Sequence, residues 1–150
     1  MSSEGAPLDG VESWGLGRRG RPRLPGPILL VEDDPDLSDL LSELLGDSGY
    51  EVRRSSSVAE ALGVLDGGVM PPLVLLDWTL EGVGGAGLLA ELERRGSGAQ
   101  VLLCTGVQES ESDPLPLERV SGLVRKPFAA EELLAAIEAA LLAVEGSLAP

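Results

Sequence analysis

Residues 28–46 read ILLVEDDPDLSDLLSELLG and predict one complete strand–helix unit. The unit opens with an aliphatic run, residues 28–31, as in a strand that is buried on both faces. Asp34 followed by Pro35 has the form of a helix N-cap with proline at the first helical position. Leucines then recur at helical intervals up to Gly46, which indicates an amphipathic helix. A buried strand joined to such a helix is the repeating unit of an α/β protein.

The same alternation continues along the rest of the chain. The patterns predict strands at residues 49–54, 73–77, 100–105 and 121–126, and helices at residues 87–95 and 129–144. A further helix is expected after Ser57, where Glu60 completes a capping box. The connection between Thr105 and Ser121 holds two prolines and several acids, so a helix there is expected to be short or absent. This order predicts a parallel sheet with helices on both faces.

The composition excludes several classes of protein. The net charge of −14 argues against nucleic-acid binding, because the chain repels the phosphate backbone. The absence of histidine excludes Ser-His-Asp and Cys-His catalytic sites, histidine metal clusters and a phosphohistidine on this chain. No apolar run is long enough to span a bilayer, and the N-terminus lacks the apolar core of a signal peptide. The single cysteine, Cys104, is expected to fill the core of a protein in the reducing cytoplasm.

The sequence predicts one folded domain between two tails. Residues 1–26 are rich in Gly, Ser, Pro and Arg and are expected to form a disordered tail or a linker. Within them, the basic stretch at residues 17–23 favours a solvated linker over a nucleic-acid or membrane contact. Residues 27–145 hold the alternating pattern and are expected to fold, and residues 146–150 are expected to form a C-terminal tail.

Polar side chains stand at the ends of four predicted strands: Glu32, Asp33, Asp77, Thr105 and Lys126. In an open parallel sheet these ends meet at one edge, where ligands bind. Crowded carboxylates require a cation, and an all-oxygen ligand set favours Mg²⁺. Lys126, the only lysine in the chain, would bind a phosphoryl oxygen as a compact charge, and Thr105 would hydrogen-bond another. A carboxylate is then the natural phosphoryl acceptor.

Four motifs occur in this order: VEDD (31–34), LLDWTLEG (75–82), LLCTG (102–106) and RKPF (125–128). Together they resemble the receiver domain of bacterial two-component response regulators. The resemblance covers residues 27–144 and implies a flavodoxin-like (βα)5 fold. This is a doubly wound, five-stranded parallel sheet with strand order 2-1-3-4-5, here with helix 4 short or irregular.

The resemblance also implies a role for each matching residue of the metal and phosphoryl site. Asp77 is the expected phosphoacceptor. Asp33 and Asp77 are expected to bind Mg²⁺ directly, Glu32 to hold a metal-bound water, and Thr79 to complete the metal site with its backbone carbonyl.

Further roles follow for the residues that switch the conformation. Thr105 is the expected switch hydroxyl, and Lys126 is expected to pair with the phosphoacceptor and then with its phosphate. The peptide bond between Lys126 and Pro127 is expected to be cis. The sequence departs from the family where Leu123 replaces the aromatic switch residue and Glu81 replaces a proline after the phosphoacceptor. These departures put the ordinary relay and the ordinary dimer face in question, but not the phosphorylation chemistry.

The function implied is that of a phosphoacceptor module in a two-component phosphorelay, with no enzymatic turnover beyond self-catalysed phosphoryl acceptance and loss. With no histidine on this chain, the donor would be a partner histidine kinase or a histidine phosphotransfer protein. The downstream effector is not identified. The chain would be a stand-alone receiver or part of a hybrid kinase, and a homodimer stays open.

Two other functions compete with this one. A degenerate receiver would serve only as a phosphorylation-independent docking module. The missing aromatic and the weak fourth helix favour this alternative, and the intact acidic pair and lysine argue against it. An aspartyl-phosphate hydrolase would place a second carboxylate two residues after its nucleophile, where this chain has Thr79.

Overall fold

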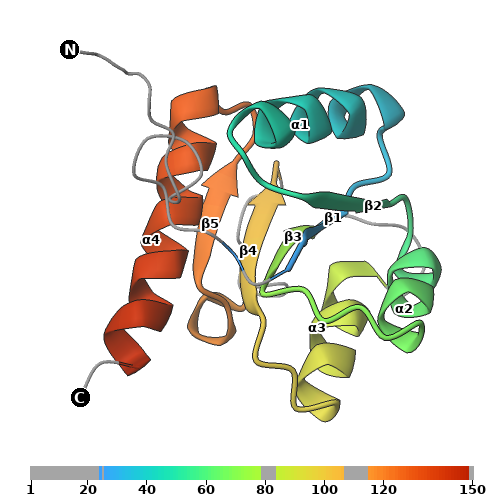
Figure 1. The fold of residues 1–150 in the computed structure, drawn as a ribbon. Helices are drawn as coiled ribbons and strands as arrows, with labels where there is room; N and C mark the ends of the chain where they lie inside the picture. The colour runs from blue at the N-terminus through green and yellow to red at the C-terminus, as the bar shows by residue number, and fades with distance from the viewer. Residues whose placement is uncertain (1–23, 25, 79–83, 107–114, 149–150) are drawn as a thin grey trace.

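The computed structural model describes residues 24, 26–78, 84–106 and 115–148, with side chains up to residue 142. Strands and helices alternate along these residues (Figure 1). The strands are β1 (Ile28–Val31), β2 (Val52–Ser55), β3 (Leu73–Asp77), β4 (Gln100–Thr105) and β5 (Gly122–Arg125). The helices are α1 (Pro35–Asp47), α2 (Val58–Asp66), α3 (Gly84–Arg94), α4 (Ala130–Leu148) and the short 3₁₀ helix η1 (Leu117–Arg119).

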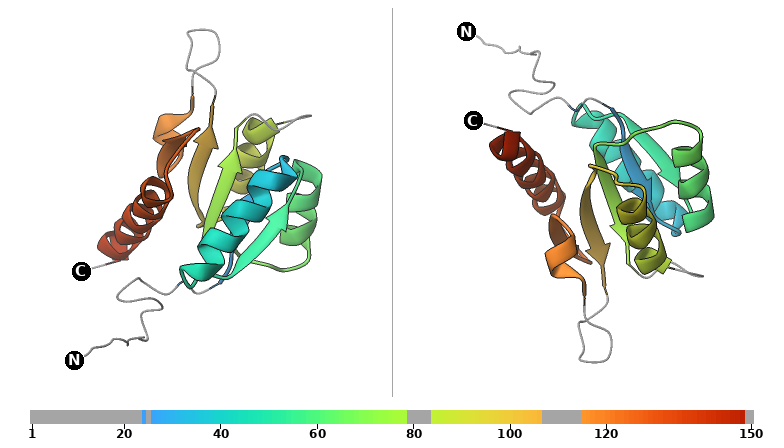
Figure 2. Two further views of the ribbon diagram at one scale, coloured as in Figure 1. Left: turned by 90° about the horizontal axis from the view of Figure 1, so that it is seen from above. Right: turned by 90° about the horizontal axis from the view of Figure 1, so that it is seen from below.

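All strand pairs of the sheet are parallel, and the order is β2-β1-β3-β4-β5. Helices α1 and α4 pack against one face, and α2 and α3 against the other. Figure 2 shows helices on both sides of the sheet in two further views. The strand order reverses between β1 and β3, which places a ligand-binding crevice at the carboxyl ends of these strands. The predicted doubly wound sheet and its strand order are thus confirmed.

Aliphatic side chains make up nearly the whole core. Strands β1 and β3 are buried along their full length, because helices cover both faces of the sheet. Successive strand residues point to opposite faces, so Leu75 belongs to the core under α1 and α4, while Leu76 belongs to the core under α2 and α3. Cys104 is buried in the first of these two cores, as predicted.

The predicted helix starts are largely confirmed. The Asp34 carboxylate accepts hydrogen bonds from the backbone N–H groups of Asp36 and Leu37 and caps α1. Ser57 caps α2, since its hydroxyl accepts a hydrogen bond from the backbone N–H of Glu60 at 3.1 Å. The second half of the predicted capping box is displaced by one residue. The Glu60 carboxylate accepts a hydrogen bond from the backbone N–H of Ser56 at 2.7 Å.

Two helix boundaries differ from the prediction. Helix α3 begins at Gly84 rather than at residue 87, because no strong start signal precedes its apolar repeat. Helix α4 continues to Leu148, although the predicted helix ended at Val144 and residues 146–150 were expected to form a tail. A single glycine such as Gly146 costs a helix only about 1 kcal/mol relative to alanine, which is not enough to end it. The other domain boundary falls among the N-terminal residues, most of which lie outside the described part.

The connection between β4 and β5 matches the prediction of a short or irregular fourth helix. Residues 107–114 lie outside the described part, and η1 is the one helical turn among residues 115–120. Arg119 donates two hydrogen bonds to the Glu93 carboxylate, at 2.9 and 2.6 Å, and so ties η1 to α3. Among the described residues, no helix is both long and apolar enough to cross a membrane.

The buried centre of the sheet predicts how stability responds to truncation. Leu75 is fully buried in β3, so Leu75→Ala is expected to lower the free energy of unfolding by about 2–5 kcal/mol. Leu40, which is 60% exposed on α1, is the matched control, and Leu40→Ala is expected to change stability by about 0.5 kcal/mol or less. Urea denaturation followed by circular dichroism measures both values. Equal losses in the two variants would contradict the assigned core.

Candidate functional site

Four strands bring polar side chains to the carboxyl edge of the sheet. Glu32 directly follows β1, and its backbone N–H donates to the carbonyl of Ser55 at 3.0 Å, which extends the pairing of β1 with β2. Asp77 and Thr105 are the last residues of β3 and β4. The side chains of Glu32, Asp77 and Thr105 are buried. This edge therefore holds ionisable groups that are largely withdrawn from water.

Three carboxylates form a compact cluster at this edge. Glu32, Asp33 and Asp77 each offer an oxygen, and these oxygens lie within 4.8 Å of one another. Glu32 and Asp77 are buried, whereas Asp33 is exposed and leaves the cluster accessible from solvent. Such an all-oxygen donor set fits a hard divalent cation such as Mg²⁺. Repulsion among the carboxylates is a physical reason for a cation to bind there.

Lys126 supplies the positive charge that faces this cluster. Its ammonium nitrogen lies 3.0 Å from Glu32 Oε1 and 3.4 Å from Asp77 Oδ2. The backbone N–H of Lys126 donates to the carbonyl of Thr105 at 3.0 Å, which holds the residue at the end of β5. The peptide bond to Pro127 is cis, as expected. The predicted contact between Lys126 and Asp77 is present, but the shorter contact is to Glu32.

Burial and charge act in opposite directions on the ionisable groups of this cluster. Burial raises the pKa of Glu32, and the hydrogen bonds from Lys126 and from the backbone N–H of Asp34 offset only part of this effect. Burial by itself would lower the pKa of Lys126, but the hydrogen bond to Glu32 and the negative charges of Asp77 and Glu32 outweigh it and raise that pKa. Lys126 is therefore a permanent cation in this site at neutral pH.

The two expected switch residues lie on the neighbouring strands. Thr105 is completely buried at the end of β4. Leu123 pairs with Leu103 in the β4–β5 register and packs, partly buried, against the core under α2 and α3. Thr79, whose carbonyl was expected to bind the metal, and Glu81 lie outside the described residues.

A close backbone approach beside Asp77 was not anticipated from the sequence. A Cβ atom on Gly85 would lie 2.7 Å from Trp78 Cε3 and 3.0 Å from Trp78 Cα, so only glycine fits at the start of α3. Trp78 directly follows Asp77 and packs partly buried against the core under α2 and α3. The glycine-rich run before α3 was the available signal, but it does not say which glycine is in contact.

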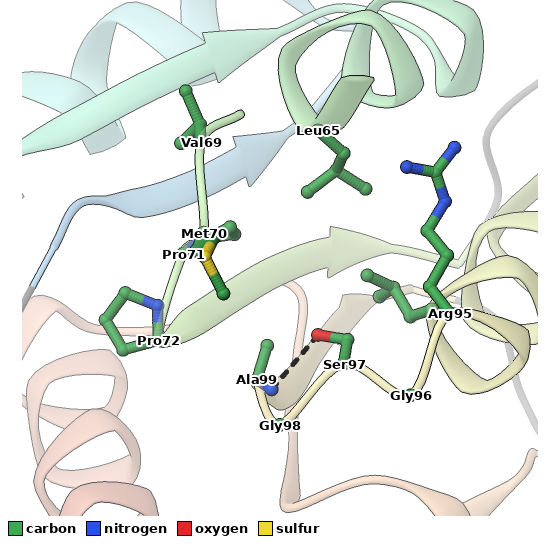
Figure 3. Close-up of a pocket in the computed structure, with 11 residues that line it drawn as sticks. Leu65, Val69, Met70, Pro71, Pro72, Arg95, Gly96, Ser97, Gly98 and Ala99 are labelled. Carbon is green, nitrogen blue, oxygen red and sulfur yellow. Dashed lines mark hydrogen bonds between the residues drawn. The ribbon is translucent and has the colours of Figure 1, made fainter. Parts of the chain in front are cut away.

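A cavity of about 400 Å³ lies at the opposite edge of the sheet, where β3 and β4 begin (Figure 3). Its walls are mainly apolar and include Leu65, Met70 and Pro72. Arg95 at its rim donates hydrogen bonds to Glu91 and to Asp66, both at 2.7 Å. Its guanidinium is thus already paired within the chain.

Cys104 is an inert member of the core rather than a reactive group. Burial raises the pKa of its thiol to about 12, so the thiolate is not populated at neutral pH. The sequence-based assignment of Cys104 to the core is therefore confirmed.

Comparison with known proteins places this arrangement in a family. The family model of the response regulator receiver domain matches residues 28–138. The chain belongs to the response regulator receiver family. As a receiver domain of response regulators, it is a signalling module of the kind found in two-component systems.

Relatives of this receiver include longer regulatory proteins. It is 38% identical to the uncharacterized transcriptional regulatory protein YkoG of Bacillus subtilis, over 77% of this chain and 51% of that protein. It is 33% identical to the DNA-binding response regulator MtrA of Mycolicibacterium smegmatis, over 76% of this chain and 50% of that protein. The receiver thus spans about half the length of the curated relatives it matches.

Solved structures of response regulators share the fold. The CheY-like receiver domain protein of Methanospirillum hungatei is 26% identical with a TM-score of 0.74, covering 81% of this chain and 98% of that one. The response regulator TrrA of Thermotoga maritima is 30% identical with a TM-score of 0.67, covering 77% of this chain and 98% of that one. The TrrA structure is a complex with Mg²⁺ and BeF.

The contact between Gly85 and Trp78 predicts a local clash in this receiver. Gly85→Ala is expected to lower the free energy of unfolding by about 1–3 kcal/mol, because the added methyl group overlaps the Trp78 ring and backbone. Gly63→Ala is the control in helix α2, where a Cβ atom meets nothing within 4 Å. Gly63→Ala is expected to raise the free energy of unfolding by about 0.5–1 kcal/mol. Urea denaturation measures both, and the same sign in both variants would contradict the close approach.

The ion pairs of Lys126 predict a stability loss that depends on pH. Lys126→Met leaves Glu32 and Asp77 buried without their cation, which is expected to cost roughly 3 kcal/mol at neutral pH. The change also raises the already elevated pKa of Glu32. In folded Lys126→Met, Glu32 then binds a proton more tightly than in the unfolded chain. The stability lost relative to the unmodified chain should therefore shrink as the pH falls from neutral toward the pKa of Glu32.

Urea denaturation of Lys126→Met at neutral pH and at about pH 5 tests both parts of this prediction. The control is Arg53→Met, the same charge change at an exposed position of β2, with an expected effect of about 0.5 kcal/mol or less. If Lys126→Met were no worse than Arg53→Met, or if its loss did not shrink at the lower pH, the assigned ion pairs would be wrong.

Proposed function

We propose that this receiver accepts a phosphoryl group on Asp77 from a phosphohistidine of a partner histidine kinase or histidine phosphotransfer protein. The observation that carries the proposal is the juxtaposition at the sheet edge. Three carboxylates offer oxygens within 4.8 Å of one another, and the Lys126 ammonium lies 3.4 Å from Asp77. An acid cluster with one fixed cation and room for a second suits transfer of a dianionic group.

Mg²⁺ is the cofactor proposed for this cluster. Asp33 and Asp77 would bind it directly, Glu32 would hold one of its waters, and the Thr79 carbonyl would complete the ligand set. When bound, the ion neutralises negative charge on the transferring phosphoryl group. The Mg²⁺–BeF complex of TrrA, a structure 30% identical to this chain, supports the assignment.

The protein groups then act on the phosphoryl group in turn. An Asp77 carboxylate oxygen attacks phosphorus, the phosphorus–nitrogen bond to the donor imidazole breaks, and the imidazole leaves with the bonding electron pair. Lys126 stabilises the negative charge on the phosphoryl oxygens and afterwards pairs with the phosphate. Thr105 would donate its hydroxyl to another oxygen, and Leu123 would move with it in place of the family's aromatic residue.

Phosphorylation would change the balance between two conformers of the receiver, which a downstream effector then reads. We place this module in the cytoplasm, where such donors act. The net charge of −14 disfavours direct contact of the receiver itself with nucleic acid. Leu123 and the short helical turn before β5 speak for a docking-only role, but the acidic cluster and Lys126 speak against it.

Removal of the acceptor carboxylate tests the proposal. Asp77→Asn is expected to abolish the gain of one phosphoryl group that intact-mass spectrometry detects after incubation with acetyl phosphate and Mg²⁺, because an amide is not a nucleophile here. Asp47→Asn, at the far end of α1, is the matched control and should label like the unmodified chain. Labelling of Asp77→Asn at the same rate as the control would sink the assignment.

A further inference from the structure

A second cavity, of about 330 Å³, adjoins the carboxylate cluster where β1 and β2 end. Its walls combine carboxylates of the cluster with hydroxyls and a guanidinium: Glu32, Asp33, Ser38, Arg54, Ser55 and Ser56 are among them. Because water occupies about 30 Å³ per molecule in the liquid, a cavity of this size and polarity has room for several waters. It thus has room for water and shares two acids with the proposed metal site.

Arg54 and Ser56, two polar groups of this cavity, are already paired within the chain. Arg54 donates from Nε to the Ser38 hydroxyl at 3.0 Å and pairs with Asp39 at 2.5 Å. The Ser56 hydroxyl donates to the Glu60 carboxylate at 2.9 Å. An anion at Arg54 would have to displace these contacts, so water is the occupant favoured beside Arg54 and Ser56.

Ser55 is the exception among these polar groups. Its side chain is only 3% exposed, and within the described part of the chain its hydroxyl oxygen has no hydrogen-bond partner. A buried hydroxyl without a partner is unfavourable, and such groups in proteins are usually satisfied by an ordered water. The cavity that Ser55 lines has room for such a water.

The backbone places Ser55 beside the acids. Ser55 pairs with Val31 in the β1–β2 register, and its carbonyl accepts the hydrogen bond from the backbone N–H of Glu32 at 3.0 Å. The residue therefore stands directly beside the point where the chain turns from β1 into Glu32 and Asp33. A water held by its hydroxyl has its other neighbours in the same cavity as these two carboxylates.

We propose that Ser55 is a positioning residue of the metal site: its hydroxyl holds a water that joins the cavity to the hydration shell of the divalent ion at Glu32 and Asp33. The proposal rests on the proposed function, since it assumes that a divalent ion binds there. Mg²⁺ keeps several waters when it binds to proteins, and hydrogen bonds to such outer ligands contribute to affinity.

The test is divalent-ion affinity, measured with Mn²⁺ as the probe through the electron paramagnetic resonance signal of the free ion. Ser55→Ala is expected to weaken binding by roughly 10-fold, the lower end of outer-ligand effects. Ser55→Thr keeps the hydroxyl and should restore binding. Ser56→Ala removes a hydroxyl from the same cavity that is already paired with Glu60, and it should bind like the unmodified chain.

Unfolding by urea without metal supplies the second readout. If the Ser55 hydroxyl is hydrogen-bonded to a water, its removal relieves no desolvation penalty. Ser55→Ala should therefore not raise the urea midpoint. A raised midpoint with unchanged Mn²⁺ affinity would show that the hydroxyl is unsatisfied and would overturn the proposal. So would a loss of affinity below about threefold, or an equal loss in Ser56→Ala.

Asp33→Asn distinguishes failure of the proposed metal site from failure of the role proposed for Ser55. If the unmodified chain binds Mn²⁺ no better than Asp33→Asn, the proposed metal site itself fails and the role of Ser55 fails with it. If the unmodified chain binds well and Ser55→Ala binds equally well, only the role of Ser55 is overturned.

Discussion

The charge balance at the carboxyl edge of the sheet is the constraint on which the rest of this receiver depends. Glu32 and Asp77 are buried carboxylates, and Lys126 is the cation that contacts both of them. Without a cation, burial of two negative charges this close together would be strongly unfavourable. In the proposed function, the same crowding of carboxylates would attract a divalent ion, which would in turn favour a phosphoryl group.

The topology of the parallel sheet brings Glu32, Asp77 and Lys126 together. Parallel strands end at one edge, and the reversal of strand order between β1 and β3 opens a crevice there. Aliphatic residues on both faces of β1 and β3 hold that edge in place, so Asp77 extends from a rigid strand rather than from a loop. Gly85 adds a close contact between α3 and Trp78, which restricts the chain directly after Asp77. The acidic site is thus built on the most buried part of the molecule.

Two departures from the family lie in β5 and in the connection that precedes it. The connection between β4 and β5 has a single 3₁₀ turn in its described part, and Arg119 ties that turn to Glu93 on α3. Leu123 packs into the core under α2 and α3 where an aromatic side chain is usual in the family. A receiver of this form would transmit phosphorylation through a surface that differs from the ordinary one.

Local sequence patterns determined the order of strands and helices, the Asp34 cap, and the five polar residues expected at the sheet edge, because hydrophobic spacing and capping residues act over a few positions. Only the tertiary structure decided how those residues pair. Lys126 and Glu32 are 94 positions apart, and no pattern along the chain shows that their contact is shorter than the one to Asp77. The buried Ser55 hydroxyl, the approach of Gly85 to Trp78 and the extension of α4 to Leu148 were likewise hidden. Local patterns report energies between near neighbours, whereas contacts between distant segments are set by how whole elements pack.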